Sequence, residues 1–307
     1  MKNRNPKNKQ RIVFRSRVLP LAASIVAGVI VQWFVSSSPG LQPMTGTIAA
    51  IGFYKDQDFV IGAADSRSIT GETASDDTCK VFALRSGLFF IETGAAALYR
   101  KRAKILDVAS IAFNAAKEVG DIHDAKRLAE LWAVAVENQL NDLTSSGKTQ
   151  FDQQVKPGSS FVKGVFVSAG SKGQFDAFNT PIIYAPEETI HFVHHLEPIV
   201  PSDDGIYVIT DQFSLLIEEM INNKTLRAFQ VNQLWRASVR SESRETREVA
   251  RIKAYMQAAI DWSNDPEVHG PIDVIVLRSN GSVFWPNRKS SCASEEESYL
   301  RGHSRPH

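Results

Sequence analysis

Six residues between positions 45 and 94 are of types that can together perform acyl transfer. They are two threonines at the start of a β-rich run, an aspartate and an arginine in an AADSR turn, a lysine and a glycine: Thr45, Thr47, Asp65, Arg67, Lys80 and Gly94. A threonine hydroxyl is a poor nucleophile at neutral pH and needs a base beside it. A lysine ammonium lowers the pKa of a neighbouring amine or hydroxyl through like-charge repulsion. The set therefore indicates chemistry at a hydroxyl that charged neighbours activate.

Each of these residues also has an ordinary structural explanation. Asp65 can cap its own turn, and Gly94 can allow a tight turn between two elements. Threonine suits any strand, because its branched side chain packs well on a sheet. Arg67 and Lys80 can be plain surface cations at strand ends. Only the joint occurrence of the six, in this order, indicates a site.

The residues that carry the pattern belong to three short stretches. The first runs from 45 to 67 and reads TGTIAAIGFYKDQDFVIGAADSR; TCKV follows at 78–81 and TGAAA at 93–97. This order resembles the beginning of a proteasome β subunit or of its bacterial relatives, and the resemblance extends less closely to the closing hairpin. It implies an α+β fold built as the four-layer αββα sandwich of the N-terminal-nucleophile hydrolases.

The resemblance also implies a mechanism. The base would be the α-amino group of the nucleophilic threonine, freed by cleavage of the preceding peptide bond, with a pKa of about 8 in model compounds. Lys80 would lower the pKa of this amine and Asp65 would hold Lys80. Backbone N–H groups of the Thr93-Gly94 turn, at a helix start, would stabilise the oxyanion. The implied substrate is a peptide or small amide, without cofactor or metal, and the implied assembly is a homo-oligomer.

The nucleophile itself stays open between two threonines. Thr45 gives the family-like TxTIA opening but lies several residues too far from Asp65. Thr47 gives a better distance and follows a glycine, as proteasome nucleophiles do. A longer turn at 56–58 would absorb the excess for Thr45, so Thr45 is the preferred candidate and Thr47 is kept beside it.

The later family positions depart from the pattern. A family serine falls on Asp211, whose carboxylate would raise the pKa of the amine and replace a hydroxyl that assists self-cleavage. A second motif keeps its aspartate, Asp265, but has Val268 where the family has serine. These departures motivate a second hypothesis from another class: a catalytically inactive member that serves as a membrane-anchored binding or assembly module.

The elements that must position these residues come as strands in runs and helices in pairs. Predicted strands cover 47–54, 59–64, 80–84, 88–92, 161–169, 174–178, 182–184, 189–194, 206–209, 272–277 and 282–285. Predicted helices cover 95–119, 124–143, 213–221 and 244–262. Because the strands do not alternate singly with helices, the order favours an α+β fold with layered sheets.

An apolar segment precedes the folded region. Residues 18–35 carry no charge, and as a helix they reach about 27 Å, close to the roughly 30 Å core of a bilayer. Seven cations and no acidic residue precede it, which predicts a single-pass inner-membrane anchor with 1–17 in the cytoplasm and the folded domain outside. The competing interpretation is a signal peptide cleaved near the serines at 36–38, leaving a secreted or periplasmic protein. Segment 36–44 would link to a hydrolase domain at 45–288, followed by a disordered tail at 289–307.

Composition excludes several other classes of function. The formal net charge is +1, so no global field recruits nucleic acid. Two cysteines exclude a disulfide framework and a cysteine-built metal site, and a single pairing of Cys79 with Cys292 stays open. His191 and His195 would share a strand face about 13 Å apart without an evident third ligand, so we expect no metal there.

Overall fold

The described part of the chain covers most of the predicted domain. In the computed structural model, the described residues are 42–46, 49–53, 58–70, 73–100, 103–120, 124–145, 155–170, 174–186, 191–199, 206–208, 226–238, 240, 242–262 and 269–302. They all belong to one compact unit, residues 31–307. The segment 18–35, the predicted helix 213–221, Thr47, Asp211, Asp265 and Val268 lie outside them. No helix among the described residues is long and apolar enough to span a membrane.

The larger of two antiparallel sheets carries most of the site. Its strands lie in the order β11 (Phe192–His194), β10 (Phe175–Tyr184), β9 (Ser160–Ala169), β7 (Leu88–Arg100), β1 (Gln42–Gly46), β4 (Ser68–Thr70) and β5 (Thr73–Ser75). Beside this path, β12 (Glu197–Pro198) pairs with β10, while β6 (Val81–Arg85) and β8 (Ala103–Asp107) pair with β7. The predicted strands 174–178 and 182–184 are thus parts of one strand, β10.

The smaller sheet contains the two hairpins that the sequence predicts at either end of the domain. Its order is β13 (Ile206–Val208), β2 (Ala49–Phe53), β3 (Phe59–Ala64), β14 (Asp273–Arg278) and β15 (Val283–Asn287). The β14–β15 hairpin turns at Gly281, whose φ of 80° favours glycine. Both hairpins are confirmed, with β2 and β3 paired antiparallel.

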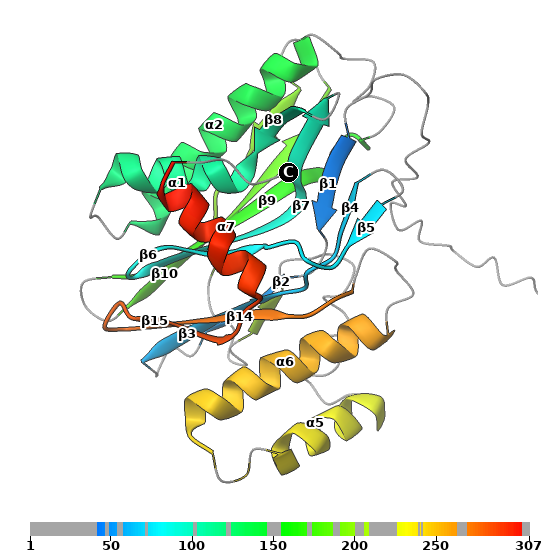
Figure 1. The fold of residues 1–307 in the computed structure, drawn as a ribbon, viewed down its shortest axis with the longest axis vertical. Helices are drawn as coiled ribbons and strands as arrows, with labels where there is room; N and C mark the ends of the chain where they lie inside the picture. Colours follow the sequence, from blue (N-terminus) through cyan, green and yellow to red (C-terminus); the bar gives the residue numbers. More distant parts are fainter. Residues whose placement is uncertain are drawn as a thin grey trace, which may run out of the picture. The chain divides into compact units, whose positions relative to one another are not determined.

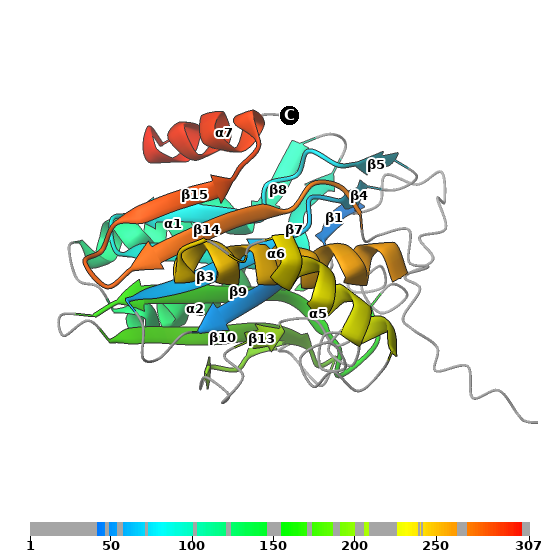
Figure 2. The same ribbon diagram turned by 90° about the horizontal axis from the view of Figure 1, so that it is seen from below.

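Helices cover each sheet on one side (Figure 1). α1 (Val108–Val119), α2 (Ala125–Ser145) and α7 (Ser290–Leu300) share a buried cluster with the larger sheet. Trp132 of α2 packs so close to β9 that a Cβ at Gly164 would come within 2.7 Å of its ring. α6 (Arg244–Trp262) packs on the smaller sheet, where it lies over β3 and β14 (Figure 2), and α5 (Leu226–Ser238) packs on α6.

A third apolar cluster joins the two sheets. Most of its members are branched or aromatic residues, and they include, from both sheets, Val60, Val81, Phe89, Ile91, Val165, Val167, Ile275 and Leu277. Such side chains fill the space between pleated surfaces well. The α+β prediction is therefore confirmed at the level of two antiparallel sheets with helices packed on them.

The first predicted helix begins thirteen residues later than expected, at Val108 rather than at Ala95. Residues 95–100 instead extend β7, because β1 pairs with it on one edge and β8 pairs with its last residues. Alanine has a high helix propensity, but tertiary pairing overrides it here. The helix starts where Asp107 accepts a hydrogen bond from Ser110 N at 3.2 Å and so caps it.

The prediction of a disordered tail from 289 is wrong for residues 290–300, which form α7. Tyr299 of this helix is buried and donates to the Asp107 carboxylate at 3.0 Å. A disulfide fastens the first turn of α7 to the larger sheet. Such long-range contacts leave no local signal in a polar stretch of sequence.

Candidate functional site

A buried ion pair joins the ends of two strands from different sheets. Asp65 directly follows β3 of the smaller sheet, and Lys80 directly precedes β6 of the larger one. Lys80 Nζ lies 2.6 Å from Asp65 Oδ1, and the side chains are 1% and 0% exposed. The sequence predicted this partnership, and the structure brings the two residues together.

The Asp65 carboxylate uses both of its oxygens. While Oδ1 accepts from Lys80, Oδ2 accepts a hydrogen bond from the backbone N–H of Arg67 at 3.2 Å. This second bond is the turn-capping role that any aspartate in such a sequence can have. Asp65 therefore caps its turn and fixes the lysine at once.

Burial dominates the electrostatics of Lys80. The pKa of Lys80 lies below its ordinary value, first because burial disfavours the ammonium form. The charge of Asp65 opposes this effect most strongly, and buried Glu92 on β7 opposes it too, while Lys289 adds repulsion. A buried ammonium of this kind lowers the pKa of an amine or hydroxyl placed next to it.

The side chain of Arg67 pairs with another carboxylate. It forms a two-pronged ion pair with Asp76, with Nε 2.6 Å from Oδ1 and Nη2 2.9 Å from Oδ2. The hydrogen bond from Arg67 is the main cause that lowers the pKa of Asp76, and His269 Nδ1 lies 3.5 Å from the same carboxylate. The Arg67 side chain therefore links the turn after Asp65 to Asp76 through an ion pair that is partly exposed to solvent.

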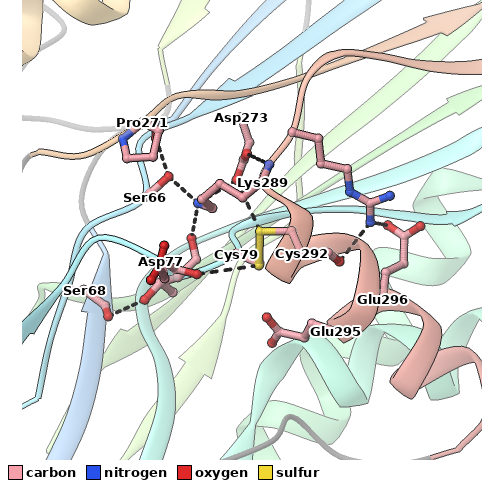
Figure 3. Close-up of a disulfide and its surroundings, with 12 residues drawn as sticks. Ser66, Ser68, Asp77, Cys79, Pro271, Asp273, Lys289, Cys292, Glu295 and Glu296 are labelled. Atoms are coloured by element: carbon pink, nitrogen blue, oxygen red, sulfur yellow. Dashed lines mark hydrogen bonds and ion pairs between the residues drawn. A yellow bond between two sulfur atoms is a disulfide. The ribbon is translucent and has the colours of Figure 1, made fainter.

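Lys289 is a second lysine at the site, and sequence reasoning missed it. Its ammonium donates to Ser66 Oγ, to Thr78 O at 2.8 Å and to Asp273 Oδ2 at 2.8 Å (Figure 3). Ser66 is the neighbour of Asp65, and Thr78 lies two residues before Lys80. The side chain is 11% exposed, so this network is largely withdrawn from water.

A disulfide between Cys79 and Cys292 lies beside this network (Figure 3). Cys79 stands between Thr78 and Lys80, and Cys292 lies in the first turn of α7. Both cysteines are buried. The signal that would have found the pair is two cysteines in a chain predicted to be exported, since disulfides persist in oxidising compartments.

Gly94 lies inside β7, not at a helix start. Its φ is 79°, and a Cβ there would come 2.6 Å from Phe161 O, so no side chain fits. Because α1 begins only at Val108, the expected help of a helix N-terminus for an oxyanion at Gly94 is absent. Any such role rests on the strand N–H groups alone.

The chain crosses from the larger to the smaller sheet close to this point. β1 ends at Gly46, which is opposite Gly94, and β2 begins at Ala49, which is opposite Ala64. Thr45 is the fourth residue of β1. The described structure therefore places the end of β1 beside Gly94 and the start of β2 beside the residue that precedes Asp65. Thr47, Asp211 and Asp265 are outside the described residues.

Comparison with known proteins adds no further constraint. A scan of the chain against models of protein families gives no match, and a search of curated proteins gives none either. The site geometry therefore carries the functional argument.

Proposed function

We propose that the chain is a threonine-type N-terminal-nucleophile hydrolase of amide or peptide bonds, similar to proteasome β subunits. The observation that carries the proposal is the fully buried Asp65–Lys80 pair with its 2.6 Å contact. Burying two charges costs more free energy than burying an apolar pair of similar volume. Titratable groups with shifted pKa values cluster at functional sites, which favours a catalytic reason for this pair.

The arrangement of elements supports the finer fold proposal. Two antiparallel sheets contact each other through a shared apolar cluster, and helices pack on the larger sheet and on the smaller one. This is the set of contacts that a four-layer αββα sandwich requires. The resemblance in the first strands implies the same architecture.

The strand registers favour Thr47 over Thr45 as the nucleophile. Ala49 pairs with the residue that directly precedes Asp65. Thr47 is two positions before Ala49 along the chain and can be at most about 7 Å from it, whereas Thr45 is four positions before it and can be up to about 14 Å away. Thr45 also lies within β1, which pairs along both of its edges.

In the proposed reaction, hydrolysis of the Gly46–Thr47 peptide bond first frees the α-amino group of Thr47. This amine accepts the hydroxyl proton while Oγ1 attacks the carbonyl carbon of the substrate. The proton passes to the leaving nitrogen as the C–N bond breaks, and water then hydrolyses the ester and restores the hydroxyl. The Lys80 ammonium keeps the pKa of the amine low, and Asp65 holds Lys80.

The disulfide supports an exported domain, since such bonds persist outside the cytoplasm. We place the folded domain outside the inner membrane, anchored through residues 18–35 until cleavage before the nucleophile releases it, or released earlier by signal cleavage. A homo-oligomer remains the expected assembly, and a peptide or small amide the expected substrate.

The proposal is tested on the full chain with an electrophile that reacts with N-terminal threonine. Labelling of the wild type should map to Thr47 and disappear in Thr47→Ala, whereas Thr45→Ala, a matched control two residues away, should keep it. Equal labelling of the variant that lacks both threonines would overturn the proposal.

A second candidate is the catalytically inactive module, which the departures at Asp211 and Val268 favour. The position of Gly94 within β7, fourteen residues before α1 begins, favours it as well. Amide turnover that depends on Lys80 would exclude this candidate.

A further inference from the structure

Two features next to the buried pair have no part in the mechanism above: the Lys289 ammonium and the Cys79–Cys292 disulfide. Both come from the C-terminal segment around the start of α7, more than two hundred residues after Asp65 in the sequence. Both contact the segments that carry Asp65 and Lys80. The C-terminal segment therefore contacts both halves of the buried pair's surroundings.

Lys289 connects the two halves of the pair through their chain neighbours. It donates to the side chain next to Asp65, at Ser66, and to the carbonyl of Thr78, two residues before Lys80. The Ser66 hydroxyl donates in turn to Pro271 O. A single ammonium thus bridges the turn after β3 and the segment before β6, beside the direct backbone hydrogen bond from Thr78 N to Ser66 O at 3.1 Å.

Asp273 keeps Lys289 in this place from β14. Its Oδ2 lies 2.8 Å from Nζ, and its Oδ1 accepts from the Lys289 backbone N–H at 3.0 Å. Because the Asp273 side chain is only 2% exposed, its contact with the Lys289 ammonium is a buried, charge-assisted hydrogen bond. Asp273 therefore holds the Lys289 side chain where it acts on Lys80.

The disulfide fastens the same connection covalently. Cys79 immediately precedes Lys80, and Cys292 lies three residues after Lys289, whose carbonyl accepts from the Cys292 N–H at 3.2 Å. Without the S–S bond, the start of α7 would be held near Lys80 by noncovalent contacts alone. Its formation limits the distance between Lys289 and the segment that carries Lys80.

We infer that Lys289 is a positioning residue for the Asp65–Lys80 pair and that the Cys79–Cys292 disulfide delivers it, so that oxidation of these cysteines completes the site. In this step the two thiols lose two protons and two electrons and form the S–S bond. A disulfide oxidant of the exported compartment accepts the electrons and becomes a dithiol. The significance of this step for catalysis rests on the proposed hydrolase function, while the charge effect on Lys80 can be measured without it.

The direction of the charge effect follows from the groups that face Lys80. Asp65 and Glu92 favour its ammonium form, whereas Lys289 disfavours it. Removing the charge of Lys289 should therefore raise the pKa of Lys80. A site completed by oxidation would also stay incomplete in the reducing cytoplasm, before the chain is exported.

The test follows the ¹⁵N-labelled Nζ of Lys80 by NMR in the full chain as pH rises, with the signal assigned through Lys80→Arg. Lys289→Met should raise the titration midpoint of Lys80, and Lys289→Arg should restore the wild-type value. Cys79→Ala with Cys292→Ala should raise it in the same direction. The combined variant should show less than the sum of both shifts, because the two changes act on one connection.

Lys117→Met is the matched control, because Lys117 Nζ also donates to α7, at Tyr299 O, but at its far end. It should leave the midpoint unchanged. A folded Lys289→Met with an unchanged midpoint, or fully additive shifts, would overturn the inference; Lys289→Gln, which removes the charge but keeps a donor, decides the matter if Lys289→Met does not fold. Shifts as expected in a chain whose threonines resist labelling would remove the hydrolase proposal and leave the positioning role standing.

Discussion

Two ion pairs lie at the end of β3, two residues apart in sequence, and their environments differ sharply. Both have a closest contact of 2.6 Å. The Asp65–Lys80 side chains are 0% and 1% exposed, whereas those of Arg67 and Asp76 are 21% and 39% exposed. The same closest distance therefore has different consequences: water and salt screen the exposed pair, whereas the buried pair is screened much less. Only the buried pair has the strength to tune a reacting group.

Breaking the buried pair should have the largest effect. Lys80→Met leaves the Asp65 charge buried without its lysine and should lower the free energy of unfolding by about 3–5 kcal/mol. Replacing both residues, as Lys80→Met with Asp65→Leu, should restore most of that stability but not the threonine labelling. Urea unfolding and labelling of the same samples measure the two effects. A double variant as unstable as the single one would mean that the pair is structural.

Removing the disulfide should come next in size. Cys79→Ala with Cys292→Ala should lower the free energy of unfolding by about 2–4 kcal/mol, because the cross-link no longer restricts the unfolded chain. Since Cys79 adjoins Lys80, the loss should reach the buried pair but spare the Arg67–Asp76 pair. Hydrogen exchange resolved to single backbone amides by NMR, at Asp65 and Lys80 for the buried pair and at Arg67 and Asp76 for the exposed pair, distinguishes these outcomes; uniform loosening of both pairs would contradict the expectation.

The exposed pair should matter much less. Arg67→Met should change the free energy of unfolding by only about 0–1 kcal/mol, and the difference should shrink in high salt. Chemical unfolding at two salt concentrations checks this prediction. If Arg67→Met lowered the free energy of unfolding as much as Lys80→Met does, the two pairs would not differ in the way expected.

The smallest expected effect is the contribution of Asp76 to the free energy of unfolding, which should disappear in acid. The pKa of Asp76 is lowered below its ordinary value of 3.8, chiefly by the hydrogen bond from Arg67. Its stabilising contribution is therefore fully present above pH 3.8 and is lost as pH falls through the lower folded-state value. The stability difference between wild type and Asp76→Asn should thus be small at neutral pH and vanish in strong acid. A difference that grows on acidification would contradict this sign.

The sequence predicts the elements and residues that are set by local pattern. The β2–β3 hairpin, the helix at 244–262 and the closing hairpin follow from apolar periodicity and turn residues. Asp65 and Lys80 could be identified because they stand in a short ordered motif. Their burial depth could not, since it depends on how two sheets pack.

The remainder depends on contacts between distant parts of the chain. Lys289 and Cys292 sit in a polar stretch that looks like a tail, and only their pairing with residues near Lys80 gives them a structure. The same is true of residues 95–100, where alanines favour a helix but β1 and β8 impose a strand. Local propensity fails wherever a partner comes from far along the chain.

The most direct test of the central claim is the N-terminal residue and intact mass of the protein isolated from its native membrane or medium. The hydrolase account predicts a chain that begins at Thr47, or at Thr45, with the α-amine of that threonine free. A chain that still begins at Met1, or that is cut near Ser38, would leave both threonine amines in peptide bonds and contradict the account.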